Sequence, residues 1–295
     1  MNVGGNFVAI DWGTSNRRAY LIGADGAVLA TWSDDRGVLS LGPDDFPREI
    51  SSLRQRWGVE PVMIAGMAGS SRGWLDVPYV HCPADATSLA QAMIPAPLDG
   101  VMMIPGVAQI SDTHCDVMRG EEVQVFGAIN AGLAPPDALF CQPGTHNKWI
   151  RTRQGRIADF VTVMTGELYS LLLSHGIFAG MLVGDACDGA AFQSGVERGV
   201  TARSLGAALF EIRASVLLGQ LEATDAAAFA SGVLIGNDLA ACDDVSNRTV
   251  HLLSSGSLAD LYCSAIERRG GAVVSIDSRA AFAAGVRLLR ESGRC

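Results

Sequence analysis

Hydrophobic and polar positions alternate over the first third of the chain in the manner of short β-strands. An apolar run at residues 7–10 is followed by two alternating segments, 18–22 and 28–32, with the turn Gly23-Ala24-Asp25-Gly26 between them. A short glycine-containing turn between two alternating segments is typical of a β-hairpin. The pattern therefore predicts three consecutive antiparallel strands.

Three such strands are unusual at the start of a doubly wound nucleotide-binding fold, and they indicate a ribonuclease-H-like half-domain instead. The segments that follow have helical and strand periodicity in turn. They are helix 45–57, strand 61–65, a glycine-rich loop at 66–73, helix 84–93 and strand 100–104.

The pattern restarts in the middle of the chain. A helix at 121–131 leads to a break at 132–136, and a new strand, 138–141, is followed by a hairpin of 148–151 and 156–163. A strand, a Gly-Thr turn and a hairpin thus occur twice, about 130 residues apart, which favours two half-domains of similar topology. The alternative is a single mixed sheet with a long insertion.

The second half is rich in helical patterns. In chain order we expect helices at 184–198, 202–218 and 226–241, strand 250–253, helix 257–269, strand 272–276 and helix 278–290. The expected fold class is α/β, with two ribonuclease-H-like lobes and a cleft between them. We expect the N-terminal lobe at 1–120 and the C-terminal lobe at 121–295, with residues 121–133 as the linking helix.

Composition narrows the class of protein. Hydrophobic residues make up 48% of the chain and charged residues 18%, as in ordinary globular proteins. The net charge of -9 argues against nucleic acid or an anionic membrane as a partner, because both need a basic face. The seven cysteines form no C-x-x-C pair, which favours buried free thiols in a reducing cytosol. With no leader-like start and no apolar run of about 18 residues, we expect a soluble, cytoplasmic protein.

The most informative stretch directly follows the first strand. Asp11 ends that strand and can hold Mg²⁺ through water, while Gly13 lets the backbone approach an oxyanion. Thr14 and Ser15 add hydroxyl and N–H donors for phosphate. An acidic residue at a strand end is otherwise often only a turn former.

A related turn, Gly144-Thr145, follows the strand at 138–141. Two such turns in two half-domains suggest one nucleotide held from both sides. A platform for adenine is expected at 252–261, where Gly256 lies between strand and helix. Tight packing would explain Gly256 as well, and the same alternatives apply to Gly232 and Gly236.

The catalytic base is expected at Gly120-Glu121-Glu122, where a helix begins. A carboxylate there can accept the proton of a hydroxyl that attacks phosphorus. The alternative is a helix cap, because an acidic residue in a first turn complements the helix dipole.

The substrate is expected to contact the loop at 66–74 and a small set of arginines. Arginine binds carboxylates in bidentate fashion, and a loop of glycine and serine can follow a polyol closely. The candidate contacts in the loop are Ala68, Gly69, Ser70, Arg72 and Trp74, and the candidate arginines outside it are Arg17, Arg18 and Arg119.

Two rival classes of function stay open at this point. Gly69-Ser70-Ser71-Arg72-Gly73 satisfies the G-x-S-x-G pattern of serine hydrolases, with Ser71 as nucleophile, but that pattern must lead into a helix, and Pro78 and the residues before it are poor helix formers. The other rival is a non-catalytic nucleotide-dependent switch. No Walker A, G-x-G-x-x-G or H-E-x-x-H motif occurs.

Six blocks of residues stand in a characteristic order. They are Asp11-Trp12-Gly13-Thr14, Met67-Ala68-Gly69-Ser70, Cys82-Pro83-Ala84-Asp85, Asp116-Val117-Met118-Arg119-Gly120-Glu121-Glu122, Pro143-Gly144-Thr145-His146-Asn147-Lys148-Trp149 and Met164-Thr165-Gly166-Glu167. Over more than half the chain, these blocks resemble the 2-dehydro-3-deoxygalactonokinase family. The resemblance implies the actin-like ATPase superfamily of sugar kinases, with ATP and Mg²⁺ as cofactors. It also implies phosphorylation of the 6-hydroxyl of 2-dehydro-3-deoxy-D-galactonate, a small sugar acid, in galactonate catabolism.

The segment from Gly120-Glu121-Glu122 to Phe126-Gly127, followed by Gly144-Thr145, is also similar to glycerol-kinase-like enzymes. In those enzymes an Asp in the corresponding Gly-Asp-Gln-Gln motif is the base. This chain has Glu instead, and its spacing to Phe-Gly is one residue shorter, so Glu121 and Glu122 both remain candidates. No heptad or long apolar stripe demands a dimer, and a homo-oligomer stays open.

Overall fold

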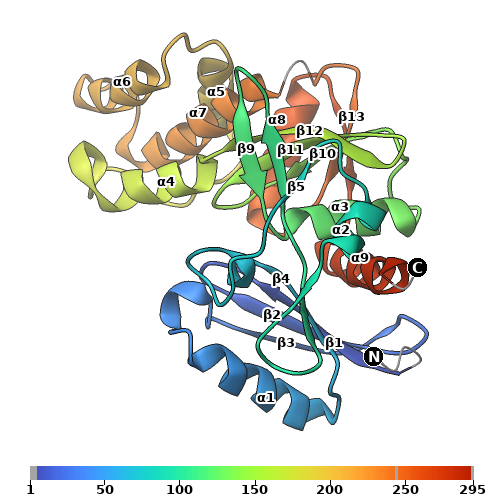
Figure 1. The fold of residues 1–295 in the computed structure, drawn as a ribbon. Coiled ribbons are helices and arrows are strands. Elements are labelled where there is room, and N and C mark those ends of the chain that lie inside the picture. The colour runs from blue at the N-terminus through green and yellow to red at the C-terminus, as the bar shows by residue number, and fades with distance from the viewer. Residues whose placement is uncertain (1–4, 243–244, 294–295) are drawn as a thin grey trace. The chain divides into compact units, whose positions relative to one another are not determined.

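The computed structural model describes residues 5–242 and 245–293. These residues form two compact units, which we describe separately (Figure 1). Unit 1 comprises the chain up to Asp137, Arg151–Phe160 and the C-terminal segment from Asp277, and unit 2 comprises Ala138–Ile150 and Val161–Ile276.

The sheet of unit 1 has six strands in the order β3-β2-β1-β4-β7-β6. β1, β2 and β3 pair antiparallel, as the sequence pattern predicts, while β4 lies parallel to β1 on its other side. The strand bounds are β1 Phe7–Trp12, β2 Arg17–Ile22, β3 Val28–Asp34, β4 Val62–Gly66, β6 Ile94–Pro95 and β7 Val101–Met103.

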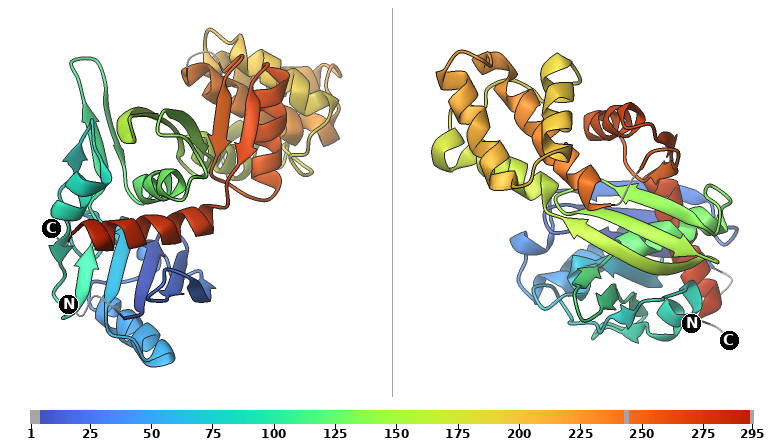
Figure 2. Two further views of the ribbon diagram at one scale, coloured as in Figure 1. Left: turned by 90° about the vertical axis from the view of Figure 1, so that its right-hand side faces the viewer. Right: turned by 90° about the horizontal axis from the view of Figure 1, so that it is seen from above.

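Helices cover both faces of this sheet. Helix α1, Asp45–Trp57, ends at Gly58 in a left-handed conformation, and it packs Phe46, Ile50 and Leu53 into one core. Helix α9, Ser278–Ser292, lies on the opposite face (Figure 2). Its Phe282 ring lies 5.4 Å from the ring of Tyr20 on β2. Because successive strand residues point to opposite faces, each strand supplies side chains to both layers.

The rest of unit 1 consists of two short helices and a small sheet. Helix α3, Glu121–Asn130, packs so tightly against α9 that a Cβ on Gly127 would lie 1.8 Å from the Ala281 carbonyl oxygen. Helix α2, Ala86–Gln91, begins with a capping box of Asp85 and Ser88. The small sheet has the order β5-β8-β9 and comprises β5 Val80–His81, β8 Val107–Ile110 and β9 Cys115–Met118.

The sheet of unit 2 repeats the strand order of unit 1. Its order is β12-β11-β10-β13-β14, so the third, second, first, fourth and fifth strands lie side by side, as in β3-β2-β1-β4-β7. The strand bounds are β10 Ala138–Gln142, β11 Asn147–Arg153, β12 Arg156–Val163, β13 Thr249–Leu252 and β14 Ala272–Ser275. The expected α/β class with two ribonuclease-H-like units is confirmed, and the single mixed sheet is wrong.

Helices fill the remainder of unit 2. They are α4 Thr165–Ser174, α5 Ala190–Val200, α6 Leu205–Leu217, α7 Ala226–Ala241 and α8 Ser257–Arg268. Helices α5 and α7 cross in close contact, because a Cβ on Gly232 or on Gly236 would lie 2.2 Å from a backbone oxygen of α5. The two glycines therefore serve packing, which settles the alternative that the sequence leaves open for them.

Two further expectations concern cysteines and membranes. The cysteines that the structure describes are free thiols, of which Cys141 and Cys242 are buried and Cys115 and Cys187 are exposed, so burial holds for only part of the set; Cys295 lies outside the described residues. Within residues 5–242 and 245–293, none of the helices has the length and apolar character needed to cross a bilayer.

Candidate active site

The turn after β1 is held by its backbone, which leaves its side chains exposed. Gly13 N–H donates to the Asn16 carbonyl at 2.9 Å, and Val38 and Leu39 N–H donate to the carbonyls of Gly13 and Thr14. The side chains of Thr14 and Ser15 are exposed. The turn can therefore offer both hydroxyls to an anion without losing its shape.

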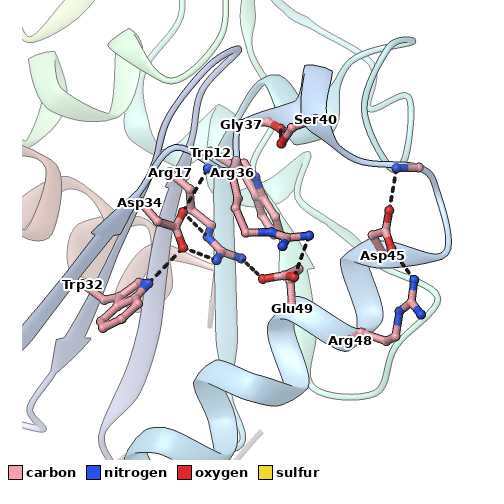
Figure 3. Close-up of polar contacts among 11 residues, drawn as sticks. Trp12, Arg17, Trp32, Asp34, Arg36, Gly37, Ser40, Asp45, Arg48 and Glu49 are labelled. Carbon is pink, nitrogen blue, oxygen red and sulfur yellow. Dashed lines mark hydrogen bonds and ion pairs between the residues drawn. The ribbon is translucent and has the colours of Figure 1, made fainter.

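A partly buried ion-pair network centred on Arg17, the residue that begins β2 after this turn, lies beside it (Figure 3). Arg17 is only 3% exposed; its Nε donates to Asp34 at 3.1 Å, and its Nη1 lies 2.9 Å from Glu49. Burial raises the pKa of Asp34, but hydrogen bonds from Arg17 and Trp32 outweigh it and hold that pKa below its usual value. Arg17 is thus engaged in structural ion pairs, which disfavours the expected contact with substrate.

Asp11 and Arg18 are cross-strand partners on the other face of the same sheet. Burial of the Asp11 carboxyl raises its pKa to about 6; the positive charge of Arg18 acts in the opposite direction and the negative charge of Glu121 adds to the rise. Arg18 is exposed at its position on β2. Asp11, the acidic residue that the sequence predicts as a metal ligand, therefore has a cation, Arg18, and a second acidic side chain, Glu121, as neighbours.

Two glycines in left-handed conformations let the surrounding backbone approach Asp11. Gly66 has φ 91° and Gly120 has φ 109°. A Cβ on Gly66 would lie 2.7 Å from the Trp12 carbonyl oxygen, and a Cβ on Gly120 would lie 3.2 Å from the Gly66 Cα. The end of β4 and the start of α3 therefore meet beside the end of β1.

The two glutamates that begin α3 differ in their surroundings. Glu122 is fully buried, and both of its oxygens accept the Gly120 N–H at 2.8 Å. Burial, together with the charge of Glu121, raises the pKa of Glu122 to about 8. Glu121 is partly exposed and accepts the Arg119 N–H at 3.0 Å. The raised pKa favours the protonated form of Glu122, and Glu121 is the more accessible of the two side chains.

The loop at 66–74 is folded on itself rather than open. Ala68 and Gly69 are buried, and the Ser70 hydroxyl donates to the Met67 carbonyl at 2.7 Å. Trp74 stacks on an α1 phenylalanine at 5.9 Å between ring centroids, whereas Arg72 is exposed.

Ser71 is exposed in the same loop, and turns rather than a helix follow it. A nucleophile elbow requires a helix directly after the serine. The G-x-S-x-G match is therefore fortuitous.

Arg119 lies beneath this loop and is 7% exposed. Its Nη2 donates to the Val77 carbonyl at 2.7 Å, and its guanidinium carbon lies 4.2 Å from the centre of the Tyr79 ring. Its Nε and Nη1 have no hydrogen-bond partner among the residues that the structure describes. Arg119 supports the loop, and its Nε and Nη1 groups could donate hydrogen bonds to a ligand.

Unit 2 contains a cavity of about 590 Å³. Its walls are mostly apolar and come from α4, α7 and α8, with two tyrosines, Tyr169 and Tyr262. Asp185 is the one charged side chain among the described residues that line it. The volume and the apolar lining are those of a small-molecule site.

The second predicted turn lies at the edge of this cavity. Gly144 lines the cavity, and its carbonyl oxygen would be 2.5 Å from a Cβ on Gly166, the second residue of α4. Glu167 N–H donates to the Thr145 carbonyl at 3.0 Å, which leaves the Thr145 side chain exposed. Gly256, with φ 76°, directly precedes Ser257, which also lines the cavity.

Sequence reasoning missed Asp238, which is fully buried below this cavity. Four side chains donate hydrogen bonds to it, from β11, α4 and α8. The sequence signal was present, because Asp238 is the single acidic residue within the otherwise apolar helix α7.

Comparisons with known proteins identify the family. A profile of the 2-keto-3-deoxy-galactonokinase family matches residues 11–289. The 2-dehydro-3-deoxygalactonokinase of Escherichia coli K12 is 36% identical to this chain over 285 residues, which make up 95% of this chain and 96% of that protein.

Solved structures agree in fold. A candidate 2-dehydro-3-deoxygalactonokinase from Sinorhizobium meliloti superposes with a TM-score of 0.88 at 36% identity, covering 98% of this chain and 96% of that one. The ADPNP-bound activator of 2-hydroxyisocaproyl-CoA dehydratase from Clostridium difficile shares the fold alone, with a TM-score of 0.54 at 13% identity over 97% and 95% of the two chains. The resemblance that the six sequence blocks indicate is confirmed, and the chain belongs to the 2-keto-3-deoxy-galactonokinase family.

Proposed function

We propose that this protein transfers the γ-phosphoryl group of ATP to the 6-hydroxyl of 2-dehydro-3-deoxy-D-galactonate, in galactonate catabolism. The products are ADP and 2-dehydro-3-deoxy-6-phosphogalactonate. The observation that carries the proposal is the cluster of Asp11 on β1, Arg18 on β2 and Glu121 on α3, in a chain that belongs to a family of sugar-acid kinases. The names of the relatives support the choice of substrate.

We assign Glu121 as the base and Glu122 as a supporting acid. Glu122 is fully buried and both of its oxygens accept the Gly120 N–H, so it is poorly placed to take a proton from a substrate. Glu121 would take the proton of the 6-hydroxyl as that oxygen bonds to the γ-phosphorus and the bond from phosphorus to the ADP oxygen breaks. The remaining contribution is in-line placement and neutralisation of charge.

The nucleoside of ATP is assigned to the cavity of unit 2. Apolar walls suit a purine ring, and Asp185 offers an acceptor for a hydroxyl or amino group. The phosphates are assigned to the turns, with hydroxyl and N–H donors from Thr14 and Ser15 and from Gly144-Thr145. Gly13 and Gly256 lie in turns whose backbone could approach the nucleotide closely, because glycine has no side chain.

Mg²⁺ fits Asp11 as an ion that arrives with the nucleotide. The residues that the structure describes contain no group of three or more acids, histidines or cysteines that would form a protein cage. Mg²⁺ that accompanies a nucleotide is commonly bound by one or two carboxylates and by several phosphate and water oxygens. A single protein carboxyl group, that of Asp11 beside Glu121, fits this pattern. When bound, the ion would neutralise phosphate charge.

The sugar acid is assigned to Arg18, Arg72 and Arg119 with the loop at 66–74. Arg18 and Arg72 are exposed and need no rearrangement to meet a ligand. Arg119 has two donors without a partner among the described residues, which suits a carboxylate once the loop above it moves. Ala68, Gly69, Ser70 and Trp74 would then shape the loop more than touch the ligand.

The test is an ADP-release assay coupled to a dehydrogenase, with a panel of 3-deoxy-2-keto sugar acids and simple sugars. We expect release that depends on the sugar acid and favours the galacto epimer. A serine hydrolase would instead cleave esters without nucleotide, and a nucleotide switch would bind ATP without sugar-dependent release. Either outcome would overturn the proposal.

A further inference from the structure

Helix α6 lies at the edge of unit 2 and has apolar residues on both of its faces (Figure 1). Ala208 and Ile212 are fully buried in the core that α6 shares with α7. On the opposite face, Phe210 is 59% exposed and Leu217 is 66% exposed. A helix that is apolar all round is normally buried. The outer face of α6 is therefore suited to a partner, which the described residues of this chain do not supply.

Four residues form a stripe along this outer face. The stripe comprises Ala207, Phe210, Ala214 and Leu217, whose spacings of three and four residues place them on one side of the helix. Small and large side chains alternate along it. Because the stripe spans only residues 207–217, it is too short to stand out as a heptad pattern in the sequence.

Two neighbouring side chains enlarge the exposed apolar surface. Leu218, directly after α6, is 74% exposed, and Ile177, in a short 3₁₀ helix after α4, is 48% exposed. Arg213 Nη1 donates to the Ile177 carbonyl at 2.7 Å, which places that 3₁₀ helix beside α6. Together with Phe210 and Leu217, these residues expose on the order of 500 Å². An apolar patch of this size is large for a monomer and is often functional.

Charge narrows the choice of partner. The chain has a net charge of -9, so two copies repel each other unless they meet through an uncharged face. The stripe has no charged residue, and the two charged residues of α6 lie at its sides. Glu211 accepts a hydrogen bond from Arg198 at 2.7 Å, and Arg213 is held by the carbonyl contact described above. A nucleic acid or a charged peptide would meet no counter-charge on the stripe.

The stripe is complementary to a second copy of itself. When two α6 helices lie antiparallel with position 212 at a two-fold axis, Phe210 of each copy faces Ala214 of the other, and Leu217 faces Ala207. Each large side chain then meets a small one, as in knobs-into-holes packing. The same surface serves both copies, which closes a dimer. Since each copy contributes about 500 Å², the pair buries on the order of 1,000 Å², where specific interfaces begin.

We propose that the α6 stripe is the interface of a homodimer in which two α6 helices pair antiparallel about a two-fold axis. The area is at the lower end for specific contacts, so we expect a dimer that forms at micromolar protein concentrations. Phe210 is the expected anchor, because aromatic residues contribute most of the binding energy in many interfaces.

Sedimentation velocity of the full-length protein between about 1 and 100 µM measures this dimer. Phe210→Glu and Leu217→Glu should each raise the Kd of dimerisation at least about tenfold. Thermal melts of both variants should stay near the wild type, because both side chains are exposed in the monomer. If Phe210→Glu fails to fold, Ala207→Glu tests the same interface, since an acidic residue in the first turn of a helix favours the helix.

Ile110→Glu is the matched control. Ile110 is 68% exposed and lies on β8, so the same change there should leave the Kd of dimerisation unchanged. Loss of the dimer in Ile110→Glu as well would show that added charge, rather than the stripe, decides association, and the proposal would fail.

An exchange of residues within the stripe tests the antiparallel register. Phe210→Ala leaves a gap and Ala214→Phe sets one phenylalanine against another, so each should raise the Kd at least about tenfold. The double variant again places a large residue opposite a small one, and its Kd should return to within about threefold of the wild type. Additive losses in the double variant would contradict this pairing.

Two further results would overturn the proposal. A wild-type protein that stays monomeric up to about 100 µM would mean that the stripe serves a different partner. A dimer that survives both Phe210→Glu and Leu217→Glu would mean that the two copies meet through another surface.

Discussion

Glu122 is a buried acid, and its burial makes the protein less stable as the pH rises. Its pKa is raised from 4.5 to about 8, mainly by burial and then by the charge of Glu121. Between these two values, the folded state holds a proton that the unfolded chain has released. Raising the pH through this window therefore favours unfolding, and the loss is complete only above about 8.

The size of the effect follows from the shift. Each unit of pKa corresponds to about 1.4 kcal/mol, so a rise from 4.5 to about 8 amounts to roughly 4 to 5 kcal/mol of stability lost between acid and mildly alkaline pH. Glu122→Gln cannot titrate, and its amide keeps an oxygen for the Gly120 N–H. We expect the unfolding free energy of Glu122→Gln minus that of the wild type to be several kcal/mol larger at pH 8.5 than at pH 5.

Urea titrations of both proteins at these two pH values measure the difference directly, and thermal melts should show relative shifts of on the order of 10 °C. Glu60→Gln is the control, because the Glu60 side chain is 84% exposed and should respond little. A difference between Glu122→Gln and the wild type that stays constant within about 0.5 kcal/mol across this pH range would show that Glu122 is ionised in the fold, and the reasoning would be refuted.

Four further substitutions test the site and its support. Asp11→Asn and Glu121→Gln should each lower kcat by about 10²–10⁴ while circular dichroism and urea midpoints stay near the wild type; wild-type turnover in both would refute their roles. Arg17→Met leaves Asp34 without its cation and Glu49 with Arg36 alone, and it should cost about 3–5 kcal/mol in urea unfolding, whereas a loss below about 1 kcal/mol would mean that the ion pairs are not needed. Gly166→Ala places a Cβ 2.5 Å from the Gly144 carbonyl oxygen and should raise KM for ATP; Gly206→Ala, which meets open space, is its control, and equal KM values would contradict the assignment.

The strand topology could be predicted because hairpins are local. The first three strands and the restart near residue 138 rest on alternation and turns within a few residues of each other, and the structure reproduces both. The small hairpin of β8 and β9 was missed because its strands are only four residues each and carry polar residues. Helix α4 was missed because it opens with Thr165-Gly166, and glycine has a low helix propensity.

The composition of the two units could not be read from the sequence. Helix α9 belongs to unit 1, where it covers a sheet that begins more than 250 residues earlier in the chain. Residues 151–160 also cluster with unit 1, although they continue strands of the other sheet. An amphipathic pattern shows that a helix has a buried face but carries no information on which distant sheet that face meets.

The burial of the candidate site residues was not predicted, although strand parity contained part of the answer. In β1, Asp11 alternates with the core residues Ile10 and Trp12, so it must point to the face opposite α1. The register pairs Asp11 with Arg18 and places Arg17 beside Trp12, on the face where Glu49 of α1 lies. The period of two therefore separates exposed Arg18 from Arg17, which is buried and ion-paired, although the two are neighbours in the sequence.

Asp238 shows the complementary signal in a helix. Nearly every other residue of α7 is apolar or small, and such a helix is buried on most sides. An acidic residue retained there must be supplied with donors, because an unpaired buried carboxylate is costly. The candidates for those donors are polar residues that otherwise have no reason to be buried, and Asn147, Trp149 and Thr165 all stand in the sequence blocks that define the family resemblance. A lone acid in an apolar helix thus predicts a hydrogen-bonded centre, and the buried polar residues near the Gly144-Thr145 turn indicate which segments it joins.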